Sequence, residues 1–198
     1  MEIIKRYGFL GIIEMGIFFL RTKLIFPKAR LIRFPIDIRN KRQIKINEGF
    51  TTGRHCRLEA YSHDGEVVLK IGKNVQINDF VHITAVENVL IEDNVLIASK
   101  VYISDSSHGS YKGDENDSNP NLIPKDRLLV SKPITIKENV WLGEFVSVLP
   151  GVTIGKGTIV GANSVVSKSL PEYVIAVGIP AKPIKKFNFQ SQKWEKYR

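Results

Sequence analysis

An aliphatic residue recurs at every sixth position through much of this sequence, and that spacing limits the fold more than any other feature. A second set of small or medium-sized side chains follows the first, four residues behind it. An α-helix repeats apolar residues about every 3.6 positions and a half-buried strand every second one, so neither element explains the spacing. The clearest run of the first set is Ile136, Leu142, Val148, Ile154, Val160 and Val166, and its companions are Val140, Val146, Val152, Thr158, Ser164 and Leu170.

The same spacing appears upstream in three shorter sets, which begin at Ile46, Ile71 and Ile91 and are separated by short insertions at 64–70 and 89–90. Three hexads make physical sense as one triangular coil, in which each hexad supplies a short strand and a corner, and small or turn-competent residues stand at the corners. Coils of this kind stack through parallel strand hydrogen bonds at roughly 4.8 Å. The predicted coils are 46–63, 71–88, 91–108, 136–153 and 154–171.

We therefore predict an all-β solenoid, a parallel β-helix of about five coils over residues 46–171. Each coil buries its apolar face only against its neighbours, so the two ends need caps. We expect an apolar helix and a basic connector in 1–45 and a cap or tail in 172–198. Residues 109–135 interrupt the repeat and should form a long protruding loop, and loops of this length are usually functional or disordered.

Composition limits the compartment and the class of partner. The chain has 198 residues, 43% of them hydrophobic and 25% charged, as in ordinary soluble globular proteins. Its single cysteine, Cys56, excludes an intramolecular disulfide and a Cys-rich zinc site, which favours the cytoplasm. A net charge of +9 favours anionic partners, but no zinc-finger spacing or RNA-recognition motif is present, and we expect no nucleic-acid partner.

The N-terminal stretch YGFLGIIEMGIFFL, residues 7–20, is apolar apart from Glu14 and has basic residues on both sides. It is too short to span a bilayer, which takes about 20 apolar residues, and no A-x-A-like cleavage site follows it. We expect a helix that is kept in the mature protein. Two roles remain open for it: packing against the body or a neighbouring subunit, or peripheral contact with the inner face of the plasma membrane.

The ordered series of hexads resembles the hexapeptide-repeat acyltransferases over residues 46–186, most of the chain. It is similar above all to the lipopolysaccharide O-antigen O-acetyltransferases, relatives of galactoside and maltose acetyltransferases. The resemblance implies a left-handed helix, a homotrimer with active sites between subunits, acetyl-CoA as co-substrate and a saccharide acceptor. The stretches that carry it are VQINDFVHI, VLIASKVYISD-x-x-HG, VWLGEFVSVLPGVTIGKG, GANSVVSKSLP and GIPAKPIKK.

His108 is the predicted catalytic residue. It stands in SDSSHG, where the chain leaves the third predicted coil, and the resemblance puts the family's catalytic histidine at this position. Close relatives often read D-H-x-H-G here, and this chain has Ser106 at the first of those histidines. Imidazole has an unperturbed pKa near 6.5, so it can remove a hydroxyl proton and then protonate a leaving thiolate near neutral pH.

Three further residues are predicted to contact the acceptor. Asn78 aligns with an asparagine that contacts the acceptor sugar in the sugar acetyltransferases, although its corner position also suits a left-handed turn. Asp105 is expected to orient the imidazole or the acceptor. His82, one coil before His108, is assigned to the acceptor site and is the rival base. Its other interpretation is a coil histidine without chemistry.

On the donor side, the resemblance implies acetyl-CoA in a groove between adjacent subunits, with the pantetheine arm against the last coils. Basic residues near the C-terminus match those that meet the cofactor phosphates. Trp141 could instead be an anchor of the subunit interface. The two C-terminal lysines, Lys182 and Lys185, could instead belong to a solvated tail. The matching positions are Trp141, Gly143, Ala162, Lys168, Lys182 and Lys185.

The predicted reaction is direct acetyl transfer from acetyl-CoA to a sugar hydroxyl of lipopolysaccharide O-antigen or a related surface polysaccharide precursor. Cys56 occupies an inward-facing slot with no paired base nearby in the sequence, which disfavours an acyl-cysteine intermediate. This mechanism requires no metal. The alternatives are an N-acetyltransferase acting on an amino-sugar or antibiotic and a non-catalytic β-helix scaffold.

Overall fold

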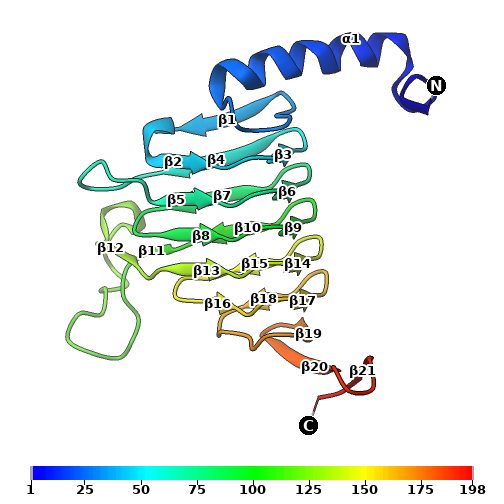
Figure 1. Ribbon diagram of the computed structural model, residues 1–198. Coiled ribbons are helices and arrows are strands. Elements are labelled where there is room, and N and C mark those ends of the chain that lie inside the picture. Colours follow the sequence, from blue (N-terminus) through cyan, green and yellow to red (C-terminus); the bar gives the residue numbers. More distant parts are fainter. Residues whose placement is uncertain (1, 198) are drawn as a thin grey trace.

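The computed structural model describes residues 2–197, and its strands form three parallel sheets that the chain visits in turn (Figure 1). Sheet A contains β3 (Thr51–Thr52), β6 (Gln76–Ile77), β9 (Leu96–Ile97), β14 (Trp141–Leu142), β17 (Ile159–Val160) and β19 (Val174–Gly178). Sheet B contains β1 (Ile36–Arg39), β4 (Cys56–Ala60), β7 (His82–Ala85), β10 (Tyr102–Ser104), β15 (Ser147–Val148) and β18 (Val165–Val166). Sheet C contains β2 (Ile44–Ile46), β5 (Leu69–Ile71), β8 (Val89–Ile91), β13 (Ile134–Ile136) and β16 (Thr153–Ile154).

Both predicted sets of side chains fill the interior of this prism. All members of the first set between Ile136 and Val166 are fully buried, and their companions are buried as well. The short strands explain the period, because each turns one side chain inward and its neighbour outward: Leu142 is buried, whereas Trp141 is half exposed. The hexapeptide spacing and the parallel sheets together fit the predicted left-handed parallel β-helix.

The corner between sheets A and B uses left-handed backbone at a position other than Asn78. In successive coils the residue with positive φ lies three positions after the inward-facing residue of sheet A, as at Phe80 (φ 59°) after Ile77. Asn78 does not have positive φ, so its interpretation as a left-handed turn residue is wrong. The residues that adopt this conformation are His55, Phe80, Lys100, Phe145 and Asn163.

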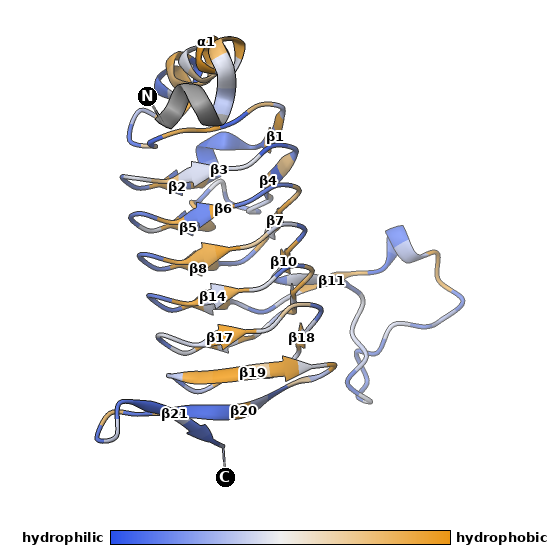
Figure 2. Ribbon diagram, turned by 90° about the vertical axis from the view of Figure 1, so that its right-hand side faces the viewer, coloured by the Kyte–Doolittle hydropathy of each residue, from blue (hydrophilic) through white to orange (hydrophobic). Residues whose placement is uncertain are grey.

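The protruding loop leaves the prism earlier than the sequence predicts. β11 (Ser106–His108) pairs antiparallel with β12 (Leu129–Ser131), so residues 106–108 belong to the excursion and not to a coil. The coil ends at Asp105, whose buried carboxylate and carbonyl both bond to neighbouring backbone. We call residues 106–133 the arm; it contains the short 3-10 helix η2 (Pro124–Asp126) and projects from the side of the prism (Figures 1 and 2).

The N-terminal helix α1 (Glu2–Ile25) lies across the first coil and closes that end of the prism (Figure 1). It changes direction at Gly8, where φ is 64°. Phe18 and Thr22 are buried, and the Thr22 hydroxyl accepts a hydrogen bond of 2.8 Å from the backbone N–H of Ile32. Within residues 2–197, no helix combines the length and hydropathy needed to cross a bilayer.

Both predicted end segments join the sheets more closely than expected. β1 already pairs with β4, so the connector before residue 46 includes a sheet strand as well as the 3-10 helix η1 (Lys41–Gln43). At the other end, β20 (Ala181–Asn188) and β21 (Lys193–Lys196) extend sheet A in antiparallel fashion from β19. At the end of β19, just before the hairpin, the Gly178 N–H donates a hydrogen bond to the buried Ser164 hydroxyl of the last coil.

Candidate functional site

His108 is exposed at the base of the arm, on the first strand of its antiparallel pair. Its backbone carbonyl accepts a hydrogen bond of 2.5 Å from the Tyr111 hydroxyl, whereas no hydrogen bond to the imidazole is formed within residues 7–197. Gly109 follows with φ of 106°, and a Cβ there would lie 2.6 Å from the Tyr111 hydroxyl. The glycine therefore lets the chain turn directly after His108, whose side chain stays exposed.

The arm holds its own shape through side chains that the sequence did not single out. The Arg127 guanidinium donates to the Tyr111 hydroxyl at 2.8 Å and to two carbonyls of the arm. The Asp117 carboxylate accepts from the backbone N–H groups of Lys112 and Gly113. Arg127 and Tyr111 thus connect the far part of the arm to the backbone of His108.

Asp105 does not have the predicted acceptor-binding role. Its side chain is fully buried, and its two oxygens accept hydrogen bonds of 2.8 Å from the backbone N–H groups of Val86, Glu87 and Asn88. A carboxylate occupied in this way satisfies the turn between sheets B and C and is out of reach of a saccharide. The prediction is corrected: Asp105 fixes the point from which the arm departs.

Asn78 lies at the corner between sheets A and B, at the opposite edge of sheet B from the arm. Its side-chain oxygen accepts a 3.2 Å hydrogen bond from Gln76, and it borders a groove of about 380 Å³ together with Asp79 and Ser99. Because sheet B separates the two corners, one chain does not bring Asn78 and His108 together.

His82 lies on the outer side of sheet B, where it pairs with a carboxylate that the sequence did not reveal. Its Nε2 is 3.0 Å from Oε2 of Glu59, which is almost fully buried and also contacts Arg39 at 2.8 Å. Burial opposes ionisation of Glu59, but hydrogen bonds from His82 and Thr84 and the charges of His82 and Arg39 outweigh it and lower the pKa of the carboxyl. Coil stacking joins residues 23 positions apart, so no local motif could have predicted this pair.

The predicted donor residues fall into two groups in one chain. Trp141 lies on the outer face of sheet A, and Gly143 and Ala162 lie at the adjoining A–B corner. A Cβ at residue 143 would come within 2.7 Å of the Ala162 backbone nitrogen, so stacked corners require glycine there. Lys168 follows β18 and lies at the B–C corner, the edge that also carries the arm.

An apolar column on the outer face of sheet A leads to the predicted phosphate-binding lysines. Leu96, Trp141, Ile159 and Ile175 are in register on successive strands, and Lys185 of β20 follows Ile175. Lys182 and Lys185 are both exposed. Figure 2 shows this change of character, from the hydrophobic strands β17 and β19 to the hydrophilic strands β20 and β21. An apolar strip that ends in lysines suits a ligand with a neutral arm and an anionic end.

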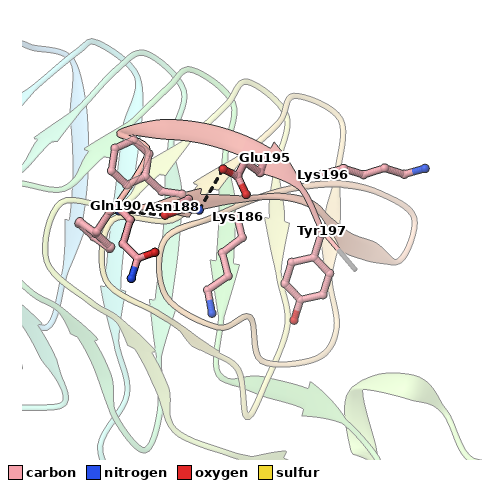
Figure 3. Close-up of a pocket in the computed structure, with 8 residues that line it drawn as sticks. Lys186, Asn188, Gln190, Glu195, Lys196 and Tyr197 are labelled. Atoms are coloured by element: carbon pink, nitrogen blue, oxygen red, sulfur yellow. Dashed lines mark hydrogen bonds between the residues drawn. The ribbon is translucent and has the colours of Figure 1, made fainter.

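A groove of about 770 Å³ lies against the C-terminal hairpin (Figure 3). It is lined by Lys186, Lys196, Tyr197 and neighbouring residues, and Asn188 and Glu195 within it are joined by a 2.9 Å hydrogen bond. None of the predicted site residues lines this groove. Among the described residues, no three His, Cys, Asp or Glu side chains are grouped as a metal site would need.

Cys56 points into the prism, and its thiol lies 3.0 Å from the carbonyl oxygen of Asn78. Burial raises the pKa of the thiol to about 11. A protonated, inward-facing thiol is a poor nucleophile, which supports the prediction of direct transfer.

Comparison with known proteins adds evidence that covers nearly the whole chain. The family model for bacterial transferase hexapeptide (six repeats) matches residues 133–168. The putative lipopolysaccharide biosynthesis O-acetyl transferase WbbJ of Escherichia coli K12 is 46% identical over 196 residues, which cover 99% of this chain and 98% of that protein. Galactoside O-acetyltransferase of the same organism is 36% identical over 152 residues, 75% of this chain and 70% of that protein.

Solved structures of acyltransferases are similar to this chain as well. Galactoside acetyltransferase in complex with coenzyme A superposes with a TM-score of 0.53 at 34% identity, covering 75% of this chain and 73% of that one. A mutant of AntD, an N-acyltransferase of Bacillus cereus, superposes with a TM-score of 0.69 at 22% identity over 87% of this chain and 90% of that one, a likeness of fold alone. The chain belongs to the hexapeptide-repeat acetyltransferases and is an acyltransferase.

Proposed function

We propose that this chain transfers the acetyl group of acetyl-CoA to a hydroxyl of a saccharide in lipopolysaccharide O-antigen or a related surface polysaccharide precursor. The observation that carries the proposal is the exposed imidazole of His108, held by its backbone at the base of the arm and free of hydrogen bonds within residues 7–197. The relative named for lipopolysaccharide O-acetylation spans nearly the whole chain, which supports this acceptor class.

In this mechanism His108 accepts the hydroxyl proton while the sugar oxygen bonds to the thioester carbonyl carbon. The tetrahedral intermediate then breaks its carbon–sulfur bond, and the imidazolium protonates the departing thiolate. The products are the acetylated sugar and free CoA, and no covalent enzyme intermediate forms. The buried, protonated thiol of Cys56 is consistent with such a direct transfer.

For the donor, we assign the pantetheine arm to the outer face of sheet A beside Trp141, with Gly143 and Ala162 at the adjoining corner. The partly exposed apolar column there and the cationic side chains of Lys182 and Lys185 at its end support this orientation. The solved galactoside acetyltransferase contains coenzyme A, which supports a CoA-linked donor in this chain.

A homotrimer would complete the site. In one chain, His108 and Lys168 lie at the B–C corner, whereas Trp141 and Asn78 lie on the far side of sheet B. A second copy that presents its A–B corner to the arm of the first would bring the two groups together. Closed cyclic symmetry would then repeat this arrangement at each interface.

We also propose that α1 holds the enzyme at the inner face of the plasma membrane, near a lipid-linked acceptor. Its outward side exposes large apolar residues at alternating spacings of three and four, while its other side packs on the first coil. A helix that is apolar on both sides is stabilised when a second surface, here the membrane, buries its outward side. The outward residues are Leu10, Ile13, Ile17, Leu20 and Leu24.

The test is thiol release from acetyl-CoA by the purified protein, with a panel of sugars and delipidated O-antigen fragments as acceptors. The proposal predicts acceptor-dependent release and a product that hydroxylamine cleaves, because esters are cleaved under conditions in which amides are stable. A hydroxylamine-resistant product would favour the N-acetyltransferase alternative. Failure to bind CoA at all would favour the scaffold alternative.

A further inference from the structure

The outer face of sheet B carries polar and aromatic side chains that the transfer reaction itself does not use. Asp37, Arg57, His82 and Tyr102 are in register on the consecutive strands β1, β4, β7 and β10. Figure 1 shows these strands stacked in that order. We call Arg57, Glu59, His82 and Tyr102 the sheet B platform.

Glu59 fixes the platform from beneath. Oε2 of Glu59 is 3.0 Å from Nε2 of His82 and accepts a 3.1 Å hydrogen bond from the Thr84 hydroxyl, while Oε1 accepts from Arg39 at 2.8 Å. These contacts use one ring nitrogen of His82, and Nδ1 makes no hydrogen bond within residues 7–197. His82 is therefore oriented in advance with one polar atom left for a ligand, which reduces the entropy lost on binding.

Tyr102 supplies an exposed aromatic surface beside this imidazole. Its side chain is 39% exposed, and the His82 ring meets it in a tilted, edge-on arrangement with centroids 5.4 Å apart. The contact holds the tyrosine ring in place on a flat sheet. A rigid aromatic ring next to hydrogen-bonding groups matches the apolar face and the hydroxyls of a sugar ring.

The charges of this face are balanced, unlike those of the whole chain. Arg39 and Arg57 are offset by Asp37 and Glu59 through contacts of 2.8 to 3.9 Å. The chain as a whole carries +9, whereas the platform lacks the excess positive charge that would attract an anion. This balance favours a neutral, hydroxyl-rich ligand over a phosphate or an acidic sugar.

The platform adjoins the base of the arm. Thr84 is in register with Ser104, whose hydroxyl contacts the Ser106 hydroxyl at 3.3 Å where the arm begins. Tyr102 precedes His108 by six residues, which is at most about 20 Å of extended chain. An oligosaccharide of a few sugars that contacts Tyr102 can therefore have another of its sugars at His108.

We propose that the sheet B platform binds a neutral saccharide segment of the acceptor, beyond the sugar that is acetylated. This inference rests on the proposed function and adds a subsite to it. It makes the enzyme selective for oligosaccharide acceptors over single sugars, because only the longer acceptor reaches both the platform and His108.

The experiment compares Tyr102→Ala with wild type, using a delipidated O-antigen oligosaccharide and a monosaccharide derived from it. We expect KM for the oligosaccharide to rise about tenfold, as lost aromatic stacking and burial would cause, with kcat and all monosaccharide constants unchanged. Tyr197→Ala is the matched control, because Tyr197 is 37% exposed and lies on the C-terminal hairpin. Glu59→Gln, which keeps the shape but removes the charge that orients His82, should raise the same KM.

The proposal would be overturned if Tyr102→Ala raised KM equally for both acceptors or for neither. It would also be overturned if light scattering showed that the variant had lost its oligomeric state. Binding of the oligosaccharide measured calorimetrically in the absence of acetyl-CoA separates this inference from the proposed function. Weaker binding by Tyr102→Ala would support the platform even if no turnover were found. Tighter binding of an acidic oligosaccharide than of a neutral one would refute the ligand class.

Discussion

Asp105 and His108 are three residues apart, and the structure gives them opposite surroundings. The Asp105 carboxylate is fully buried and accepts three backbone hydrogen bonds of 2.8 Å from the turn at 86–88. The His108 imidazole is exposed on the arm. The carboxylate anchors the arm at the prism, and this anchor sets where the imidazole stands.

Replacing Asp105 should therefore act on stability first. Asp105→Asn replaces one carboxylate oxygen with an amide NH2 group, which cannot accept a hydrogen bond, and this should cost roughly 2–4 kcal/mol of unfolding free energy. The measurements are thermal unfolding and limited proteolysis of the arm. Asp114→Asn, an exposed arm position, is the control. If Asp105→Asn left the melting temperature unchanged but weakened saccharide binding, Asp105 would have the acceptor-binding role after all.

His108→Ala should lower turnover by at least about a hundredfold, because the reaction loses its general base. CoA binding and the unfolding transition should remain as in wild type, since the ring makes no hydrogen bond within residues 7–197. His63→Ala, another exposed histidine, controls for the loss of an imidazole. Full activity of His108→Ala in a steady-state thiol-release assay would refute the assignment.

Subunit mixing tests whether the site is shared. Neither His108→Ala nor a Lys182→Glu/Lys185→Glu double variant should be active alone. If each site takes the arm of one subunit and the lysines of the next, random mixing in equal amounts should restore about a quarter of the sites. The readout is thiol release after co-expression of the two differently tagged variants. No recovery in verified mixed trimers would mean that each chain builds its site alone.

Cys56 should resist alkylation in the folded protein. Its pKa is raised to about 11 from 9.0 by burial, so almost no thiolate exists at pH 8. Iodoacetamide labelling, followed by mass spectrometry, should be slow in native protein and rapid in denaturant. The raised pKa contributes stability that is complete below the unfolded pKa of 9.0 and declines as pH rises toward 11. Rapid native labelling at pH 8 would contradict the buried position.

The outward face of α1 should bind anionic lipid vesicles. Replacing Ile17, Leu20 and Leu24 with serine should weaken binding by at least about a hundredfold, because each buried apolar side chain contributes about 1.5–3 kcal/mol. Vesicle co-sedimentation measures this, and activity on a soluble acceptor should stay unchanged. Ser107→Ala, on the arm, is a control substitution away from the helix. Loss of self-association, with vesicle binding unchanged, would show that the face is a contact between subunits.

The hexad spacing was sufficient to predict the coil, because burial of Leu142 and its equivalents depends only on which residue of each short strand points inward. The motif around His108 was sufficient to locate the exposed imidazole. Asp105 was assigned wrongly, since its sequence neighbours His108 and Ser106 gave no indication that the coil ends there and the carboxylate turns inward.

Sequence by itself thus determined the repeat and the class of fold, which follow from local spacing, and the position of the candidate base, which follows from the motif around His108. Tertiary structure alone decided that Glu59 meets His82, that Tyr102 stands beside them, and that Asn78 and His108 occupy opposite edges of sheet B. The physical reason is that stacking places residues about one coil apart in contact. The number of residues between such partners changes with the insertions in each coil, so no fixed spacing in the sequence predicts these contacts.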